Sequence, residues 1–122
     1  MVGYNENEAG DNMTREFVNM PEFERQWKAM GLDDDDLRNL QEQLLQNPNA
    51  GAIIKGTGGL RKYRFAFKNK GKSGSGRVLY IDFLAYEMIY LVFAYYKGKQ
   101  ETPTPEQCEI LRKLVKEIKD SI

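Results

Sequence analysis

The stretch Leu60-Arg61-Lys62-Tyr63-Arg64-Phe65-Ala66-Phe67-Lys68 decides the fold of this chain, because its side chains alternate in kind. Three aromatic residues fall on one side of an extended chain: Tyr63, Phe65 and Phe67. The positions between them fall on the other side and are mostly basic: Lys62, Arg64, Ala66 and Lys68. Since side chains of a β-strand point alternately to its two faces, the stretch is predicted to be a half-buried strand with a cationic face.

Two more strands are predicted directly after this one. Residues 69–76 are rich in Gly, Ser and Lys, which is typical of a hairpin loop. The segments 77–84 and 88–96 are rich in Val, Ile, Leu, Phe and Tyr, and Glu87 lies near their junction, so they form a second hairpin. Three consecutive strands joined in this way make an antiparallel meander.

Helices are predicted on both sides of the meander in the sequence. A short strand over 14–20 leads into a helix that begins at Pro21, and a second helix begins at Asp33 to Asp36 and ends at Asn47-Pro48-Asn49. Thr104 and Pro105 begin a third, amphipathic helix. The apolar residues that recur at helical spacing are Phe23, Trp27 and Met30, then Leu37, Leu40, Leu44 and Leu45, and finally Cys108, Leu111, Leu114, Val115 and Ile118.

These elements predict one α+β domain over residues 13–122, with a small antiparallel sheet packed against helices in the order β-α-α-β-β-β-α. A chain of 122 residues suits a single core. Residues 1–12 carry Asn, Glu, Gly and Asp without apolar periodicity, and they are expected to be a flexible polar tail.

The composition excludes several kinds of site. Histidine is absent and Cys108 is the single cysteine, which excludes an internal disulfide, histidine triads and multi-cysteine metal centres. The acidic run at Asp33 to Asp36 is read as a helix start rather than a metal site, and Cys108 as a core residue, so neither a metal nor a cofactor is expected. No signal peptide or membrane span is apparent, which predicts a cytoplasmic protein without membrane association.

The charges are segregated along the chain even though the formal net charge is zero. Residues 1–50 hold four basic and eleven acidic side chains, whereas residues 51–100 hold ten basic and two acidic ones. This asymmetry favours an anionic ligand at the middle segment, with nucleic acid the first candidate. The alternative is that the two halves attract each other or that the basic residues are solvated.

Metal-free cleavage of RNA is a reaction that such a basic sheet face could support. It requires a base for the 2′-hydroxyl, cations for the phosphorane and an acid for the leaving 5′-oxygen. A lysine among other cations has a lowered pKa and can serve as the base, and arginines hold phosphate oxygens bidentately. Two tyrosines, Tyr63 and Tyr96, could stack on an unpaired base, although alternation along the strand makes Tyr63 a core residue.

The chain resembles the RelE/ParE superfamily of bacterial type II toxins, specifically its HigB-like RelE branch. The resemblance covers roughly residues 14 to 119 and rests on motifs in a fixed order: 47–51 (NPNAG), 56–64 (GTGGLRKYR), 70–80 (KGKSGSGRVLY), 96–99 (YKGK), and the closing helix with Pro105-Glu106 and 111–115 (LRKLV).

This resemblance implies a RelE-like fold and a ribosome-dependent mRNA endoribonuclease, or mRNA interferase. Such a hydrolase cuts mRNA in the ribosomal A site by metal-free 2′-hydroxyl attack and thereby inhibits translation. It implies as partners mRNA, the 70S ribosome and a cognate helix-turn-helix antitoxin, with operator DNA bound only through the antitoxin of this toxin-antitoxin system.

The resemblance also assigns roles to residues. Lys62 is the base, and Arg64 and Arg77 stabilise the phosphate and the transition state. Lys97 and Lys99 occupy the basic position after the last strand. Other residues are assigned to RNA binding: Arg61, Lys68, Lys70, Lys72 and Tyr96. The RelE branch places a tyrosine near its C-terminus, but residues 100–122 contain none, so the acid is left among Lys97, Lys99 and Tyr96.

Two alternatives from other functional classes stay open. A ParE-like gyrase inhibitor shares the fold without cutting RNA, and it usually lacks a cluster like Lys62, Arg64 and Arg77. A non-catalytic module that binds nucleic acid or only its antitoxin would tolerate Lys62→Ala and Arg77→Ala.

Overall fold

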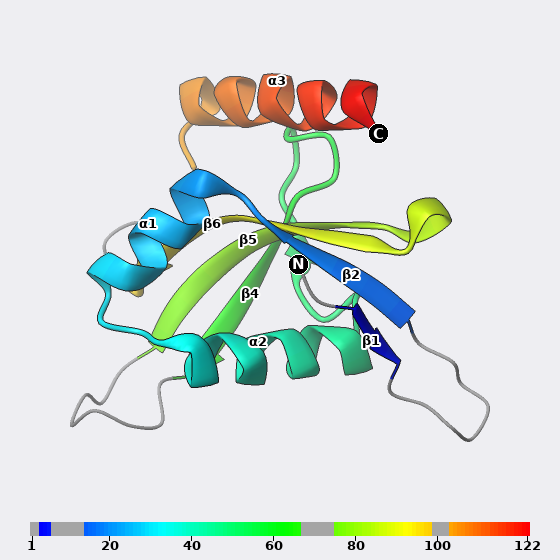
Figure 1. Ribbon diagram of the computed structural model, residues 1–122. Coiled ribbons are helices and arrows are strands. Elements are labelled where there is room, and N and C mark those ends of the chain that lie inside the picture. Colours follow the sequence, from blue (N-terminus) through cyan, green and yellow to red (C-terminus); the bar gives the residue numbers. More distant parts are fainter. Residues whose placement is uncertain (1–2, 6–13, 67–74, 99–102) are drawn as a thin grey trace.

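The computed structural model describes residues 3–5, 14–66, 75–98 and 103–122 and shows an α+β fold in which a twisted sheet lies between helices (Figure 1). Helices α1 and α2 cover one face of the sheet, and α3 covers the other. The elements, in chain order, are β1 (Gly3–Asn5), β2 (Thr14–Asn19), α1 (Pro21–Ala29), α2 (Asp34–Gln46), β3 (Ala52–Ile53), β4 (Arg61–Ala66), β5 (Ser75–Phe83), the 3-10 turn η1 (Leu84–Tyr86), β6 (Met88–Tyr96) and α3 (Pro105–Ser121).

Every helix and strand predicted from the sequence is present within a few residues of its expected bounds, and two short strands, β1 and β3, were not foreseen. Within the described residues the sheet has six strands in the order β1-β2-β6-β5-β4-β3. The meander of β4, β5 and β6 is antiparallel as predicted. The prediction of an antiparallel sheet is wrong at β2, which runs parallel to β6. Two helices and the strands β3, β4 and β5 separate β2 from β6 in the chain, and a long connection of this kind allows parallel pairing.

The N-terminal segment differs from its prediction as a tail. Gly3–Asn5 forms strand β1 and pairs with Thr14–Glu16 of β2. Apart from β1, residues 1–12 lie outside the described part of the chain.

The core below the sheet forms between its lower face and the helices α1 and α2. Pro21 occupies the first turn of α1, and Asp33 and Asp36 form a capping box at the start of α2, so the acidic run does begin a helix. The buried side chains on this face include Phe17, Phe23, Trp27, Leu40, Leu44, Phe65, Val78, Tyr80, Ile89, Leu91 and Ala94. Tyr63 packs against this core, and its hydroxyl donates to the amide oxygen of Gln43, as its predicted core position requires.

The core above the sheet joins it to α3. Leu60, Leu79, Ile81 and Val92 pack with Leu111 and Val115 of α3. The helix begins at the predicted Thr104, which forms a capping box with Gln107. Cys108 is only half-buried, so its predicted place in the core is wrong.

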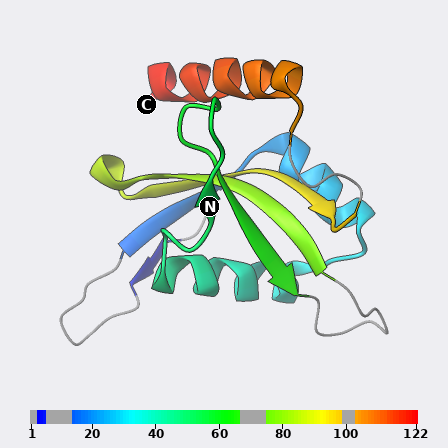
Figure 2. The same ribbon diagram turned by 180° about the vertical axis from the view of Figure 1, so that it is seen from behind.

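The glycine-rich run before β4 supports α3. Figure 2 shows the loop between β3 and β4 rising from the sheet to that helix. Gly58 has a φ of +83°, a left-handed conformation that favours glycine, and a Cβ there would lie 3.4 Å from the side chain of Val115. The hydroxyl of Thr57, fully buried, donates to the carbonyl of Ile54 and accepts from the N–H of Leu60. The glycine-rich run therefore has a structural role, because it connects the sheet to α3 and packs against that helix.

A β-bulge interrupts the pairing of β5 with β6. Leu79 pairs with Phe93 and Tyr80 pairs with Leu91, which leaves Val92 as the extra residue. Val92 and Phe93 consequently both lie on the α3 side of the sheet, while Leu91 and Ala94 lie on the opposite side. All residues of β6 after the bulge have exchanged faces relative to a regular strand.

The turn after α2 is fixed to the sheet by Tyr80. The Tyr80 hydroxyl, which is fully buried, donates to the carbonyl of Pro48 at 2.7 Å and accepts from the N–H of Gly51 at 3.0 Å. Arg61 adds a third bond, from Nη1 to the carbonyl of Gly51 at 2.6 Å. The turn and β4 are thereby held in one arrangement.

Helix α1 lies along the outer edge of β6. Strand β2 pairs only with Met88–Leu91, so the end of β6 has no neighbouring strand on that side among the described residues. The amide oxygen of Gln26 accepts a hydrogen bond from the N–H of Ala94 at 2.8 Å. None of the helices in the described ranges combines the length and apolar character that crossing a membrane requires.

Candidate nucleic-acid interface

Three of the basic residues proposed from the sequence come together on the α3 side of the sheet. Arg64 of β4 lies directly opposite Arg77 of β5, and Lys62 lies opposite Leu79, which is the next pair on the same face of the sheet. The face is established by Leu79, which belongs to the core under α3, and by Tyr63, which points the other way. We call Lys62, Arg64 and Arg77 the cationic patch. The alternation in the sequence predicted this arrangement correctly.

The three residues differ in exposure. Arg64 is exposed and Lys62 is half-buried, whereas Arg77 is only 3% exposed. The Nη1 of Arg77 donates to the carbonyl of Gly76 at 3.2 Å and to the Oγ of Ser75 at 3.4 Å. Arg64 and Lys62 can therefore meet an incoming anion directly, while Arg77 supplies a fixed positive charge beneath them.

Tyr95 extends this row of residues to β6. It is the cross-strand partner of Arg77, so Arg64, Arg77 and Tyr95 form one line across three strands. Side chains directly opposite each other on one face have Cβ atoms about 5 Å apart. An aromatic ring thus lies beside the cations, at a residue that the sequence pattern does not indicate.

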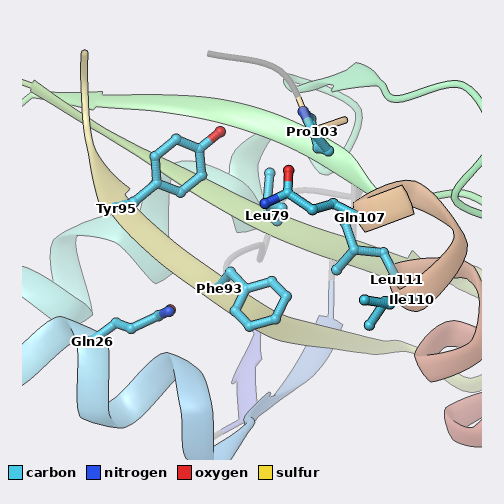
Figure 3. Close-up of a pocket in the computed structure, with 8 residues that line it drawn as sticks. All are labelled: Gln26, Leu79, Phe93, Tyr95, Pro103, Gln107, Ile110 and Leu111. Carbon is cyan, nitrogen blue, oxygen red and sulfur yellow. The ribbon is translucent and has the colours of Figure 1, made fainter. Parts of the chain in front are cut away.

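A cavity of about 310 Å³ adjoins the patch (Figure 3). Tyr95 and Phe93 project into it from β6, and Gln107 reaches toward them from the first turn of α3. The remaining lining residues are Gln26, Leu79, Pro103, Ile110 and Leu111. The cavity therefore offers apolar and aromatic walls with two amides and a phenol, and it is large enough for a small organic group.

Two residues that were assigned to RNA binding lie elsewhere. Tyr96 faces α1, and its hydroxyl donates to the carbonyl of Met30 at 2.8 Å. Arg61 alternates with Lys62 onto the α2 side and binds the carbonyls of Gly51 and Asn49. The structure thus corrects both placements: Tyr96 is on the opposite face of the sheet from the patch, and Arg61 braces a turn.

The bulge at Val92 determines which of the two adjacent tyrosines lies on the side of the patch. Simple alternation from Leu91 would bury Tyr95 and turn Tyr96 toward the patch. The extra residue reverses this order. A repeat in the sequence could not reveal the bulge, since 88–96 are apolar or aromatic without a polar marker.

The remaining basic candidates are on or beyond the ends of these strands. Lys97 is exposed directly after β6, and its backbone N–H donates to the carbonyl of Ser75, the first residue of β5. It therefore lies near the patch. The other four basic candidates lie outside the described residues: Lys68, Lys70, Lys72 and Lys99.

A second hollow, of about 610 Å³, opens near η1, at the other end of the β5–β6 hairpin. Its basic residues are engaged within the fold. Arg15 forms a bidentate ion pair with Asp82, and the Nζ of Lys119 donates to the carbonyl of Gly58. The cationic patch is consequently the better place for an anion.

No protein-family model matches the chain. The case for its function therefore rests on the cationic patch and its surroundings. Within the described ranges, no three His, Cys, Asp or Glu side chains gather in a way that could hold a metal ion. The groups that do gather are ammonium, guanidinium and phenol groups, which bind phosphates and stack on bases.

Proposed function

We propose that the chain is a RelE-type toxin that cuts mRNA on the ribosome, with the cationic patch as its catalytic surface. The observation that carries this proposal is the direct pairing of Arg64 with Arg77, next to Lys62. Like charges placed opposite each other on one sheet face destabilise the sheet. Three positive charges on one face also attract an anion such as a phosphate, so the arrangement suits an anionic ligand.

In the proposed reaction Lys62 accepts the proton of a 2′-hydroxyl. The 2′-oxygen attacks the adjacent phosphorus, and the bond from phosphorus to the 5′-oxygen breaks, which yields a 2′,3′-cyclic phosphate and a 5′-hydroxyl. Arg64 holds the non-bridging oxygens while negative charge develops. Arg77, which is buried beneath Arg64 and Lys62, raises the positive electrostatic potential at the phosphate. Lys97, whose backbone pairs with Ser75 at the start of β5, is the proposed donor of the proton to the 5′-oxygen.

The partners follow from the same proposal and from the family resemblance of the sequence. The toxin acts on mRNA in the A site of the 70S ribosome in the cytoplasm. A helix-turn-helix antitoxin neutralises it and carries it to operator DNA.

The test is translation of a defined mRNA in a purified system, with cleavage mapped by primer extension with and without ribosomes. We expect ribosome-dependent cuts from the native chain and at least a hundredfold fewer from Arg64→Ala, because one transition-state donor contributes on the order of 10²–10³ in rate. Arg64 is exposed, so this substitution leaves the core intact. Arg38→Ala is the matched control, since Arg38 is an exposed arginine of α2, on the opposite side of the sheet.

Other outcomes would replace the proposal. Unimpaired translation without any cut refutes ribonuclease activity and favours the ParE-like gyrase inhibitor, which a DNA supercoiling assay would then detect. Equal cleavage by native chain and Arg64→Ala refutes the catalytic assignment of the patch. Binding of RNA or antitoxin without cleavage favours the non-catalytic module.

A further inference from the structure

The cavity beside the cationic patch has features that the reaction described above does not use. Its walls include the rings of Tyr95 and Phe93, which project from β6 to the same side (Figure 3). Tyr95 is also the cross-strand neighbour of Arg77. One residue therefore belongs both to the row that would hold a phosphate and to the wall of an apolar cavity.

This combination matches the chemistry of a nucleotide. Phosphate and base are joined through a single sugar, so a ligand whose phosphate lies over Arg64 can reach across the neighbouring strands with its base. Aromatic side chains bind unpaired bases by stacking, and cations beside them bind the backbone. The cavity volume of about 310 Å³ lies at the small end of the range for ligand sites and fits one base better than a larger group.

We propose that Tyr95, with the cavity beside it, binds the base of the nucleotide whose phosphate lies on the cationic patch. Tyr95 supplies a stacking surface, and Phe93 and Leu79 form the apolar floor. The amide of Gln107 lies on the α3 side of the cavity, where it can contact the edge of a base (Figure 3). This inference rests on the proposed function for the identity of the ligand as single-stranded RNA.

The neighbouring residue Tyr96 provides a test of the proposal, because the two adjacent tyrosines lie on opposite faces of the sheet and are expected to have different roles. Tyr96 packs with the lower core and donates its hydroxyl hydrogen bond to Met30. Tyr95 lies across the sheet from it, on the side of Arg77. Substitution of Tyr96 should therefore change stability, and substitution of Tyr95 should change RNA binding.

The experiment measures binding of the full chain to a fluorescent single-stranded RNA hexamer with 2′-O-methyl groups at every position, which cannot be cleaved by 2′-hydroxyl attack. Six further hexamers each lack the base at one position. We expect Tyr95→Ala and Tyr95→Leu to weaken binding of the complete hexamer about tenfold. Tyr95→Phe, which keeps a ring, should stay within about twofold of the native chain. The hexamer without the relevant base should bind the native chain and Tyr95→Leu equally.

Tyr86→Ala is the matched control, because Tyr86 is a tyrosine that is 57% exposed in η1, at the far end of the hairpin. Its binding should equal that of the native chain. Tyr95→Leu retains an apolar side chain, and its thermal midpoint shows whether any loss of binding is a loss of folding.

Several results would overturn the inference. One is that folded Tyr95→Leu binds the complete hexamer as tightly as the native chain does, or that Tyr95→Phe loses as much RNA affinity as Tyr95→Leu. Another is that Tyr95→Leu loses the same affinity for every abasic hexamer as for the complete one. The last is that the native chain does not bind RNA. The assay contains no ribosome and no cleavage, so it separates the two proposals. Base-dependent binding through Tyr95 in a chain that cuts no mRNA would refute the proposed function and support this site.

Discussion

Replacing Tyr80 with phenylalanine should release the turn after α2 from the sheet. The phenol oxygen of this fully buried residue makes two hydrogen bonds, to the carbonyl of Pro48 at 2.7 Å and from the N–H of Gly51 at 3.0 Å. Tyr80→Phe keeps the ring and its packing and removes only this oxygen. Both backbone groups then lose a partner in a place that the Tyr80 ring shields from solvent.

The size of the effect follows from those two groups. An unsatisfied buried donor or acceptor costs about 1–3 kcal/mol. Two such groups, with some relaxation of the turn toward water, give a loss of about 3 kcal/mol in the free energy of unfolding. With a urea m-value of about 2 kcal/mol/M for a small domain, the midpoint falls by about 1.5 M.

Urea denaturation followed by far-UV circular dichroism measures this loss. Tyr96→Phe is the comparison, because it removes one hydrogen bond, to the carbonyl of Met30, from a half-buried tyrosine. We expect that variant to lose about 1 kcal/mol. If Tyr80→Phe loses no more than Tyr96→Phe, the turn is not held by the phenol and the reasoning fails.

Three further predictions concern the packing at Gly51, the buried ion pair of Arg15 with Asp82, and the pH dependence of the stability that Tyr80 contributes. Gly51→Ala should lower the free energy of unfolding by about 1–3 kcal/mol, because the added Cβ would lie 2.8 Å from the backbone oxygen of Lys62 and 2.9 Å from the ring of Tyr80. Urea denaturation measures this loss, and a urea midpoint equal to that of the native chain would contradict it. Asp82→Asn should cost about 3 kcal/mol, since it leaves the charge of Arg15, whose side chain is 7% exposed, without its carboxylate; the double variant Arg15→Met with Asp82→Leu should recover most of it in the same assay. Burial raises the pKa of Tyr80 above its ordinary value of 10.0, so the stability it contributes is complete below pH 10 and declines as the pH rises further. The gap in urea midpoint between the native chain and Tyr80→Phe should therefore narrow between pH 9 and pH 11, and a gap that widens would contradict the assignment.

The parts of the fold that could be predicted are those with a strong local pattern. Alternation in β4 separated Tyr63 and Phe65 from Lys62 and Arg64, and the structure confirms both faces. Helix boundaries followed from capping residues such as Thr104, which acts through its own backbone neighbourhood. These features depend on a few adjacent residues, so one sequence contains them.

The missed features depend on contacts between distant segments. β3 has two residues, Ala52 and Ile53, and it is a strand only because β4 lies beside it. The parallel pairing of β2 depends on which edge of the meander is open after the helices have packed. The same holds for the candidate site. Alternation along the strand predicted the face on which Lys62 and Arg64 lie, whereas the bulge at Val92, which depends on the pairing of β6 with β5, determines that Tyr95 and not Tyr96 lies on that face.

The contact of Gln26 with Ala94 bears on how the chain avoids self-association. The end of β6 beyond Leu91 has backbone groups on a sheet edge that β2 does not cover. Such edges pair with strands of other molecules and start aggregation. The amide oxygen of Gln26 already occupies the N–H of Ala94, and α1 lies along the same edge. A foreign strand must first displace this helix, so α1 protects the folded chain against β-aggregation in addition to closing its core.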